Sequence, residues 1–356
     1  MDEERGLRIL LVAHVAAEAR CLAESVPSAR AVGETWLLDA SDGDEVSTEA
    51  ARLGVPTKRV TWRDSLGELF DEAVRWGSDG AGAVLVVYAD EVFEEVDGDA
   101  LGAVPAAGAF GAVSIRHRLD DAGFYDEEHE TRMIASGAPG GFTGRFPVAY
   151  QVGEQALDPD ALPVVAVLSH QPARWPGLSA QRIARTESAL LRSASEQPHS
   201  PEVAYALLHC SVSLREWEVV RERVDRYRAL GDVDVERGAL VAFHDATALL
   251  CLNKPSDSLR QAKNAVRAAP RFGDAWFLIG EINRLGGRAE QAVVAYRKAF
   301  ELGRDASPVA VEDFRLTTWR PAVELAALAE RAGDESAARL WADRARELQP
   351  TVESST

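Results

Sequence analysis

The sequence predicts an N-terminal α/β domain followed by an array of helical repeats. Residues 7 to 170 alternate short apolar runs with amphipathic stretches, the pattern of strands and crossover helices in a layered α/β domain. From about Ser179 the sequence is helical in pattern almost throughout, and it repeats. A chain of 356 residues is long enough for two domains, each with its own core. We therefore expect domains at 1–178 and 179–350, with a disordered tail at 351–356.

The elements of the first domain follow from its apolar runs. Strands are predicted at residues 7–12, 35–38, 57–61, 83–88 and 164–168, and helices at 21–26, 46–53 and 66–76. Alternation at this pace implies parallel strands joined by crossover helices. The segments 137–144 and 158–163 are rich in Gly, Pro and Asp. They are either an active-site loop or ordinary turns between antiparallel strands.

The second half contains one clear repeat unit. Residues 274–302 read DAWFLIGEINRLGGRAEQAVVAYRKAFEL. They carry the spaced small and aromatic residues Trp276, Ile279, Gly280, Gly287, Ala292, Tyr296 and Ala299. Small residues let the two helices of a unit cross closely, while aromatic ones fill the gaps between units. This segment resembles the tetratricopeptide repeat.

Neighbouring units are weaker but keep the register. A shift of 34 residues places Ala265 on Ala299, since 299 − 265 = 34, and Pro270 falls at the position that closes a repeat. A last unit carries Gly333, Ala338, Ala345 and Pro350 in corresponding places. An earlier unit covers residues 202–230. We expect an array of such units.

Composition excludes several classes of protein. The chain is 46% hydrophobic and 27% charged, as in soluble globular proteins. Its 57 acidic and 39 basic residues give a net charge of −18. Binding to a nucleic-acid backbone needs clustered Lys and Arg, so no nucleic-acid partner is expected. A nucleotide remains possible, because a helix N-terminus or a metal ion can hold its phosphates.

The cysteines and the N-terminus indicate the compartment. Cys21, Cys210 and Cys251 are odd in number and far apart, without metal-ligand spacing, so we expect buried thiols rather than disulfides or zinc. The opening Met-Asp-Glu-Glu has the wrong charge for a signal peptide, and the apolar run 7–15 is too short to span a bilayer. We predict a cytoplasmic protein without a membrane partner.

Four ordered segments of the first half carry a second resemblance. Residues 21–26 read CLAESV, 37–44 read LLDASDGD, 62–64 read WRD and 88–91 read YADE. Together they resemble family 2 glycosyltransferases with the GT-A fold, over roughly residues 7 to 190. The resemblance implies a nucleoside-diphosphate sugar donor, UDP-linked, and a divalent cation, Mn²⁺ or Mg²⁺. The helical repeats would then hold a peptide or protein acceptor or a partner, with homo-oligomerisation as a further possibility.

The resemblance also assigns site residues. The residues expected to bind the nucleoside-diphosphate sugar are Ala13, His14, Asp39, Asp64, Asp90 and Arg185. Asp90 and His170 are expected to bind the metal ion. Strand-end carboxylates face the ligand crevice of a parallel sheet, where Asp39 would bind a base or ribose and Asp90 a cation. Arg185 would reach a phosphate, and Glu128, in the acidic run 126–130, would act as general base.

The sequence departs from the family at several polar positions. Tyr88 stands for the first Asp of the metal motif, Leu69 and Phe70 replace an Arg-Asn pair, and His14 lies in a turn that is otherwise Lys-Asn-Glu. The glutamate of the acceptor region has no clear counterpart near Tyr150.

Each singled-out residue also has a structural interpretation. Asp39 can cap a loop, the run from Asp90 through Glu95 can be an acidic helix start, and His14 and His170 can be hydrogen-bonded structural residues. The acidic run 126–130 can be ordinary surface.

Three functions stay open from the sequence, and enzyme status is uncertain. The first is a glycosyltransferase. The alternative is a catalytically inactive scaffold or adaptor that acts through its repeats, and the third is regulatory nucleotide binding. No GxGxxG, GxxxxGK[ST] or GxSxG motif is present, so dehydrogenase, P-loop and hydrolase functions have no support. If the protein is an enzyme, Asp39, Asp64, Asp90 and His170 should converge on one cleft. If it is a scaffold, the side chains of Tyr88, Leu69 and Phe70 should fill that cleft.

Overall fold

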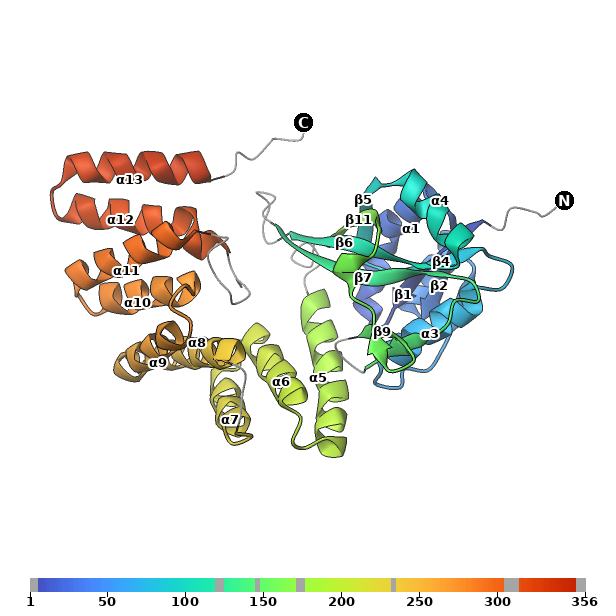
Figure 1. Cartoon of the computed structure of the whole chain (residues 1–356), viewed down its shortest axis with the longest axis horizontal. Coiled ribbons are helices and arrows are strands. Elements are labelled where there is room, and N and C mark those ends of the chain that lie inside the picture. Colours follow the sequence, from blue (N-terminus) through green and yellow to red (C-terminus); the bar gives the residue numbers. More distant parts are fainter. Residues whose placement is uncertain are drawn as a thin grey trace. The chain divides into compact units, whose positions relative to one another are not determined.

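The computed structural model describes residues 6–118, 125–144, 148–170, 177–231, 235–303 and 314–349. Side chains are described within these ranges except at 106–107, 117–118, 125–128 and 314. The chain divides into two compact units, Met1–Ser193 and Ala194–Thr356 (Figure 1). The predicted tail 351–356 lies outside the described residues.

The first unit is built on a mixed sheet. Within the described residues eight strands pair in the order β3-β2-β1-β4-β7-β6-β11-β5. The strands are β1 (Leu7–Ala13), β2 (Glu34–Asp39), β3 (Thr57–Arg59), β4 (Ala83–Tyr88), β5 (Glu91–Val96), β6 (Phe110–Arg118), β7 (Tyr125–Ala135) and β11 (Val164–His170). A second, antiparallel sheet joins β8 (Gly141–Thr143), β9 (Ala149–Val152) and β10 (Gln155–Ala156).

Parallel pairing holds for only part of the large sheet. Strands β1 to β4 pair in parallel as predicted. Strand β7 runs antiparallel to both β4 and β6, and β5 runs antiparallel to β11. The acidic run after Asp90 is therefore strand β5 and not a helix start. The glycine-rich segment 137–144 contributes strand β8, so it belongs to turns and strands of an antiparallel sheet.

Helices cover both faces of the large sheet. They are α1 (Leu22–Arg30), α2 (Glu45–Arg52) and α4 (Gly98–Ala107) on one face and α3 (Leu66–Gly77) on the other. The unit also contains α5 (Leu178–Glu196) and the short 3₁₀ turns η1 (Ala16–Arg20) and η2 (Pro159–Ala161). Alternate residues of β1 enter two different cores: Leu11 packs with α1 and α2, and Leu10 packs with α3. A strand buried on both faces reads as a continuous apolar run, which is why β1 was predictable.

The second unit consists of antiparallel helix pairs. In the described residues these pairs are α6 (Pro201–Ser213) with α7 (Trp217–Arg228), α8 (Val235–Cys251) with α9 (Pro255–Ala268), α10 (Gly273–Leu285) with α11 (Ala289–Leu302), and α12 (Trp319–Arg331) with α13 (Glu335–Leu348). Each pair packs on the next along the chain (Figure 1). A short 3₁₀ turn, η5 (Phe314–Thr317), precedes α12. This is a tetratricopeptide-like helical repeat fold, which confirms the predicted array.

Equivalent positions are buried in the second helix of every pair. They are Val220 and Tyr227 in α7, Ser258 and Ala265 in α9, Ala292 and Ala299 in α11, and Ala338 and Ala345 in α13. Close crossing of α10 and α11 depends on Gly280, where an added Cβ would lie 2.5 Å from the Tyr296 ring. The repeat register read from the sequence is therefore the packing register.

Two further findings concern the boundaries. The division between the compact units follows Ser193, so nearly all of α5 belongs to the sheet unit, although the sequence suggested a boundary at 178. Of the helices in the described ranges, none is long and apolar enough to cross a membrane.

Candidate functional site

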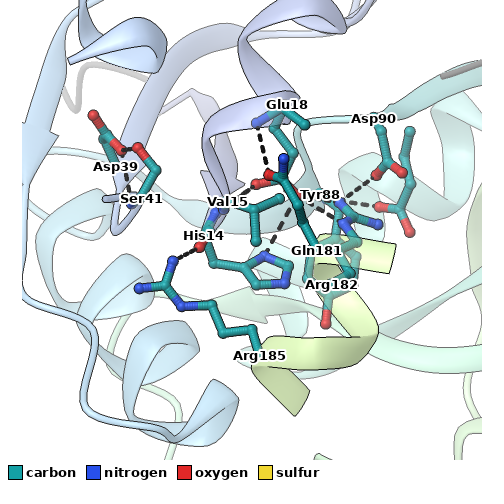
Figure 2. A network of polar contacts seen from close by, with 12 residues as sticks. His14, Val15, Glu18, Asp39, Ser41, Tyr88, Asp90, Gln181, Arg182 and Arg185 are labelled. Carbon is teal, nitrogen blue, oxygen red and sulfur yellow. Dashed lines mark hydrogen bonds and ion pairs between the residues drawn. The ribbon is translucent and has the colours of Figure 1, made fainter. Parts of the chain in front are cut away.

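A buried cluster of charged side chains lies at the carboxyl end of the sheet. Asp90 follows β4, His170 ends β11, Glu18 lies in η1 and Arg182 projects from α5. Figure 2 shows Arg182 between Glu18 and Asp90. The side chains of Glu18 and Asp90 are 0% and 1% exposed, and that of Arg182 is 15% exposed. The fold thus removes two carboxylates from water and places a guanidinium between them.

Every oxygen of these two carboxylates has a partner. Arg182 donates from Nη2 to Asp90 Oδ1 at 2.6 Å and from Nε to Glu18 Oε1 at 2.8 Å. His170 Nε2 lies 2.9 Å from Asp90 Oδ2. Glu18 Oε2 accepts the backbone N–H groups of His14 at 2.6 Å and Val15 at 2.8 Å. Charges buried in this way are tolerable because they are paired and hydrogen-bonded.

The cluster shifts the ionisation of its members. Burial alone would raise the pKa of Asp90, but Arg182 and His170 hold that pKa well below its usual range. Burial would lower the pKa of Arg182, but Asp90 and Glu18 raise it above its usual range. Burial lowers the pKa of His14 to about 4. Near neutral pH we therefore expect Asp90 and Arg182 to be charged and His14 to be neutral.

Tyr88, at the position where a first metal-binding Asp was expected, lies between two arginines. The guanidinium carbon of Arg132 is 4.5 Å from the Tyr88 ring centroid, and that of Arg182 is 5.1 Å away. Arg132 in turn donates from Nε to Glu130 at 2.5 Å and lies 3.5 Å from Glu91. Cation–π contact of this kind stabilises buried arginines. Tyr88 thus fills space with a ring that offers no carboxylate to a ligand.

Asp39 lies apart from this cluster (Figure 2). Its Oδ1 accepts from the backbone N–H of Ser41 at 2.9 Å and from the Ser41 hydroxyl at 2.6 Å. Its Oδ2 accepts from the Ser47 hydroxyl. The carboxylate closes the turn after β2, which is the structural role expected of an Asp in a loop. Ala13 ends β1 beside it, and its carbonyl accepts from the Ala40 N–H at 2.8 Å.

Asp64 and Arg185 border a pocket of about 550 Å³. Its lining includes Trp62 and Asp42. Arg185 donates to the His14 carbonyl and, at 2.9 Å, to Asp42, and its guanidinium lies over the Trp62 ring. Asp64 accepts from Trp62 Nε1 at 2.9 Å and pairs with Arg192 of α5 at 2.8 Å. Both residues expected to bind a donor thus bond to neighbours within the unit.

The structure brings together only some of the residues expected in a site. Asp90 and His170 belong to the buried cluster, His14 and Arg185 lie beside it, and Asp39 does not join them. The backbone of Glu128 lies in β7, and its side chain is outside the described residues.

The sequence predicted a metal ion bound by Asp90 and His170. Within the described part of the chain, no three His, Cys, Asp or Glu side chains are grouped to hold a metal ion. A cation on Asp90 and His170 stays a prediction.

Sequence reasoning missed two partners in this cluster, Glu18 and Arg182. The available signal was the spacing of Arg182 and Arg185, which places both on one face of a helix. The cysteines follow expectation in part. All three are free, with Cys21 and Cys210 buried and Cys251 exposed.

Comparisons with known proteins bear on the helical repeats. No family model matches the chain, and no curated protein matches it. A structure of MamA matches with a TM-score of 0.40 and 14% identity, covering 48% of this chain and 90% of that one. MamA from Desulfovibrio magneticus RS-1 matches with a TM-score of 0.40 and 19% identity, covering 48% and 88%. YrrB, described as a TPR protein with an unusual peptide-binding site, matches with a TM-score of 0.36 and 13% identity, covering 48% and 80%.

These findings correct one expectation. The identification as a family 2 glycosyltransferase is wrong, because the structures that match are of tetratricopeptide-repeat proteins. The four short segments that suggested it lie at the start of α1, at the ends of β2 and β4, and in the connection between β3 and α3, where such residues also serve the fold. Asp39, Asp64 and Asp90 each bond to groups of the same unit.

Proposed function

We propose that this protein is a non-catalytic adaptor that binds a peptide or protein partner through its helical repeats. The observation that carries the proposal is the succession of helix pairs with the same buried positions. Stacked pairs of this kind expose a continuous surface made by successive units, and extended chains bind well to such surfaces.

The polar side chains of two successive first helices suggest where a partner binds. Glu281 and Arg284 of α10 pair at 2.6 Å, and Arg284 also lies 3.4 Å from Glu324 of α12. Arg320 of α12 lies over Phe277, 5.8 Å from its ring centroid. We call Glu281, Arg284, Arg320 and Glu324 the α10–α12 charged face. These four side chains are partly exposed and offer charge-assisted hydrogen bonds to a polar backbone or side chain.

The carboxylates of the sheet unit are not arranged for catalysis, which also favours a binding role. Its strand-end carboxylates are bonded by Arg182, Arg192 and serine hydroxyls of the same unit. A general base or a metal ligand needs lone pairs directed at a substrate or an ion. Asp39, Asp64 and Asp90 are buried as well as paired, whereas the α10–α12 charged face is partly exposed, so we assign the interaction to the repeats.

Selection from a random peptide display library with the purified full chain tests the proposal. Selected peptides are then titrated calorimetrically into the wild type, into Arg284→Ala/Arg320→Ala, and into Val294→Ala. Val294 lies on α11 and is 66% exposed, so it serves as the matched control on a second helix. We expect the double variant to lose about tenfold in affinity, the effect of removing one to two charge-assisted contacts, and the control to bind like the wild type.

Two outcomes would contradict the proposal. One is a library that yields no peptide above background from a folded chain. The other is equal binding by all three proteins, which would move the partner away from the α10–α12 charged face. Circular dichroism of each variant excludes unfolding as the cause of lost binding.

A further inference from the structure

Asp90 and His170 are the two residues to which the sequence assigned a divalent cation. Asp90 supplies carboxylate oxygens, which hard cations such as Mn²⁺ prefer, and His170 supplies an imidazole nitrogen 2.9 Å away. A second carboxylate, Glu18, shares Arg182 with Asp90. Two buried negative charges so close together require a positive charge between them.

Arg182 contacts both carboxylates and the imidazole. Its Nη2 is 2.6 Å from Asp90 Oδ1 and also contacts Glu18 Oε1, and its Nη1 is 3.4 Å from His170 Nε2. The oxygens of Asp90 are thereby both engaged, one by Arg182 and the other by His170. With Arg182 in position, these residues do not fit a metal ion.

We propose that Arg182 is the built-in cation of this site and that it anchors α5 to the sheet where a divalent cation would otherwise bind. A guanidinium suits the task because it stays charged when buried and spreads several donors over two carboxylates. Leu178, one turn earlier on α5, is fully buried against Val15 and Cys21. The arginine therefore acts beside an apolar contact that seats the start of the helix. This inference is independent of the adaptor role.

Substitution of Arg182 separates the two kinds of cation. Arg182→Gln keeps a side chain of similar length but removes the charge, and Arg182→Lys keeps the charge. Arg192→Gln is the matched control, because Arg192 lies on the same helix and its side chain is 65% exposed. Thermal melting of each full-length protein is measured with and without Mn²⁺, and Mn²⁺ binding is measured by calorimetry.

We expect Arg182→Gln to melt below the wild type and to gain melting temperature when Mn²⁺ is added, since an ion that binds only the folded state stabilises it. It should bind Mn²⁺ about tenfold more tightly than the wild type or more. The wild type, Arg182→Lys and Arg192→Gln should not respond to Mn²⁺. Equal Mn²⁺ binding by the wild type and Arg182→Gln would overturn the inference, and so would a folded Arg182→Gln with no response.

If Arg182→Gln does not fold, a second variant still tests the inference. In Arg182→Gln/Asp90→Asn the uncompensated charge is halved, so we expect this protein to fold, to melt above Arg182→Gln and to ignore Mn²⁺. If the double variant also fails to fold, the loss of Arg182 acts through packing rather than charge, and the inference is wrong.

Discussion

Two glycines of the second unit allow the packing register to be tested by a pair of substitutions. Gly280 is the eighth of the 13 residues of α10, and Gly238 is the fourth of the 17 residues of α8. Replacing glycine by alanine inside a helix stabilises it by about 1 kcal/mol when nothing else changes. A Cβ at Gly238 would meet nothing within 4 Å, whereas a Cβ at Gly280 would lie 2.5 Å from two carbons of the Tyr296 ring. Both substitutions increase helix propensity, but only Gly280→Ala introduces a steric clash with Tyr296.

The magnitude follows from how little the ring can move. Ordinary contact begins at 3.4 Å, so the Tyr296 ring would have to shift by about 1 Å. Tyr296 is fully buried, and its hydroxyl donates to Glu281. Overpacking of this size costs roughly 1–3 kcal/mol. We therefore expect Gly238→Ala to be more stable than the wild type by up to about 1 kcal/mol, and Gly280→Ala to be less stable than Gly238→Ala by roughly 1–3 kcal/mol.

Urea unfolding followed by far-UV circular dichroism measures both free energies of unfolding. Because the second unit carries most of the helix, its transition dominates the signal. Equal stability of Gly280→Ala and Gly238→Ala would show that α10 and α11 do not cross closely at this residue. The repeat packing described above would then be wrong at its best-defined unit.

Two further predictions concern buried ionisable groups. Burial lowers the pKa of His14 to about 4, against 6.5 in the unfolded chain. The wild type should therefore lose roughly 3 kcal/mol as pH falls from about 6.5 to about 4. His14→Gln should lack this loss, and identical urea-unfolding profiles across that range would refute the assignment. Asp245 is fully buried and pairs with Arg221 and, at 2.8 Å, with Arg228. Asp245→Asn should cost about 1–3 kcal/mol in thermal melts, whereas the exposed Asp343→Asn should cost little; equal melting of these two variants would count against it.

Much of the fold could be predicted because its signals are local. Strand β1 reads as a continuous apolar run because both of its faces are buried. The α10–α11 pair is readable because Gly280 and Ala292 must be small where the helices cross. Strand β5 was less accessible: Glu94 and Glu95 favour a helix start by charge, but pairing with β11 determines the backbone there. Tertiary pairing outweighs local preference at such sheet edges.

The candidate site was the least predictable part, because its partners are distant in sequence. Glu18 and Arg182 form a hydrogen bond although they are 164 residues apart in the sequence. The local sequence around either residue does not predict this contact. Asp90 at the end of a strand has the same sequence appearance whether it holds an ion or an arginine. The difference depends on a helix that arrives from the far end of the unit. Sequence placed Asp90 and His170 in one region, and the structure adds the residue that decides what they do.

The position of α5 has a consequence for anyone who divides the protein into fragments. A cut at residue 178, where the sequence changes character, would take Arg182, Arg185 and Arg192 away from the sheet. Glu18 and Asp90 would then lose the guanidinium that they share. The natural end of the sheet fragment is after α5, at about the division that follows Ser193. The same helix therefore closes one folding unit and leads into the next.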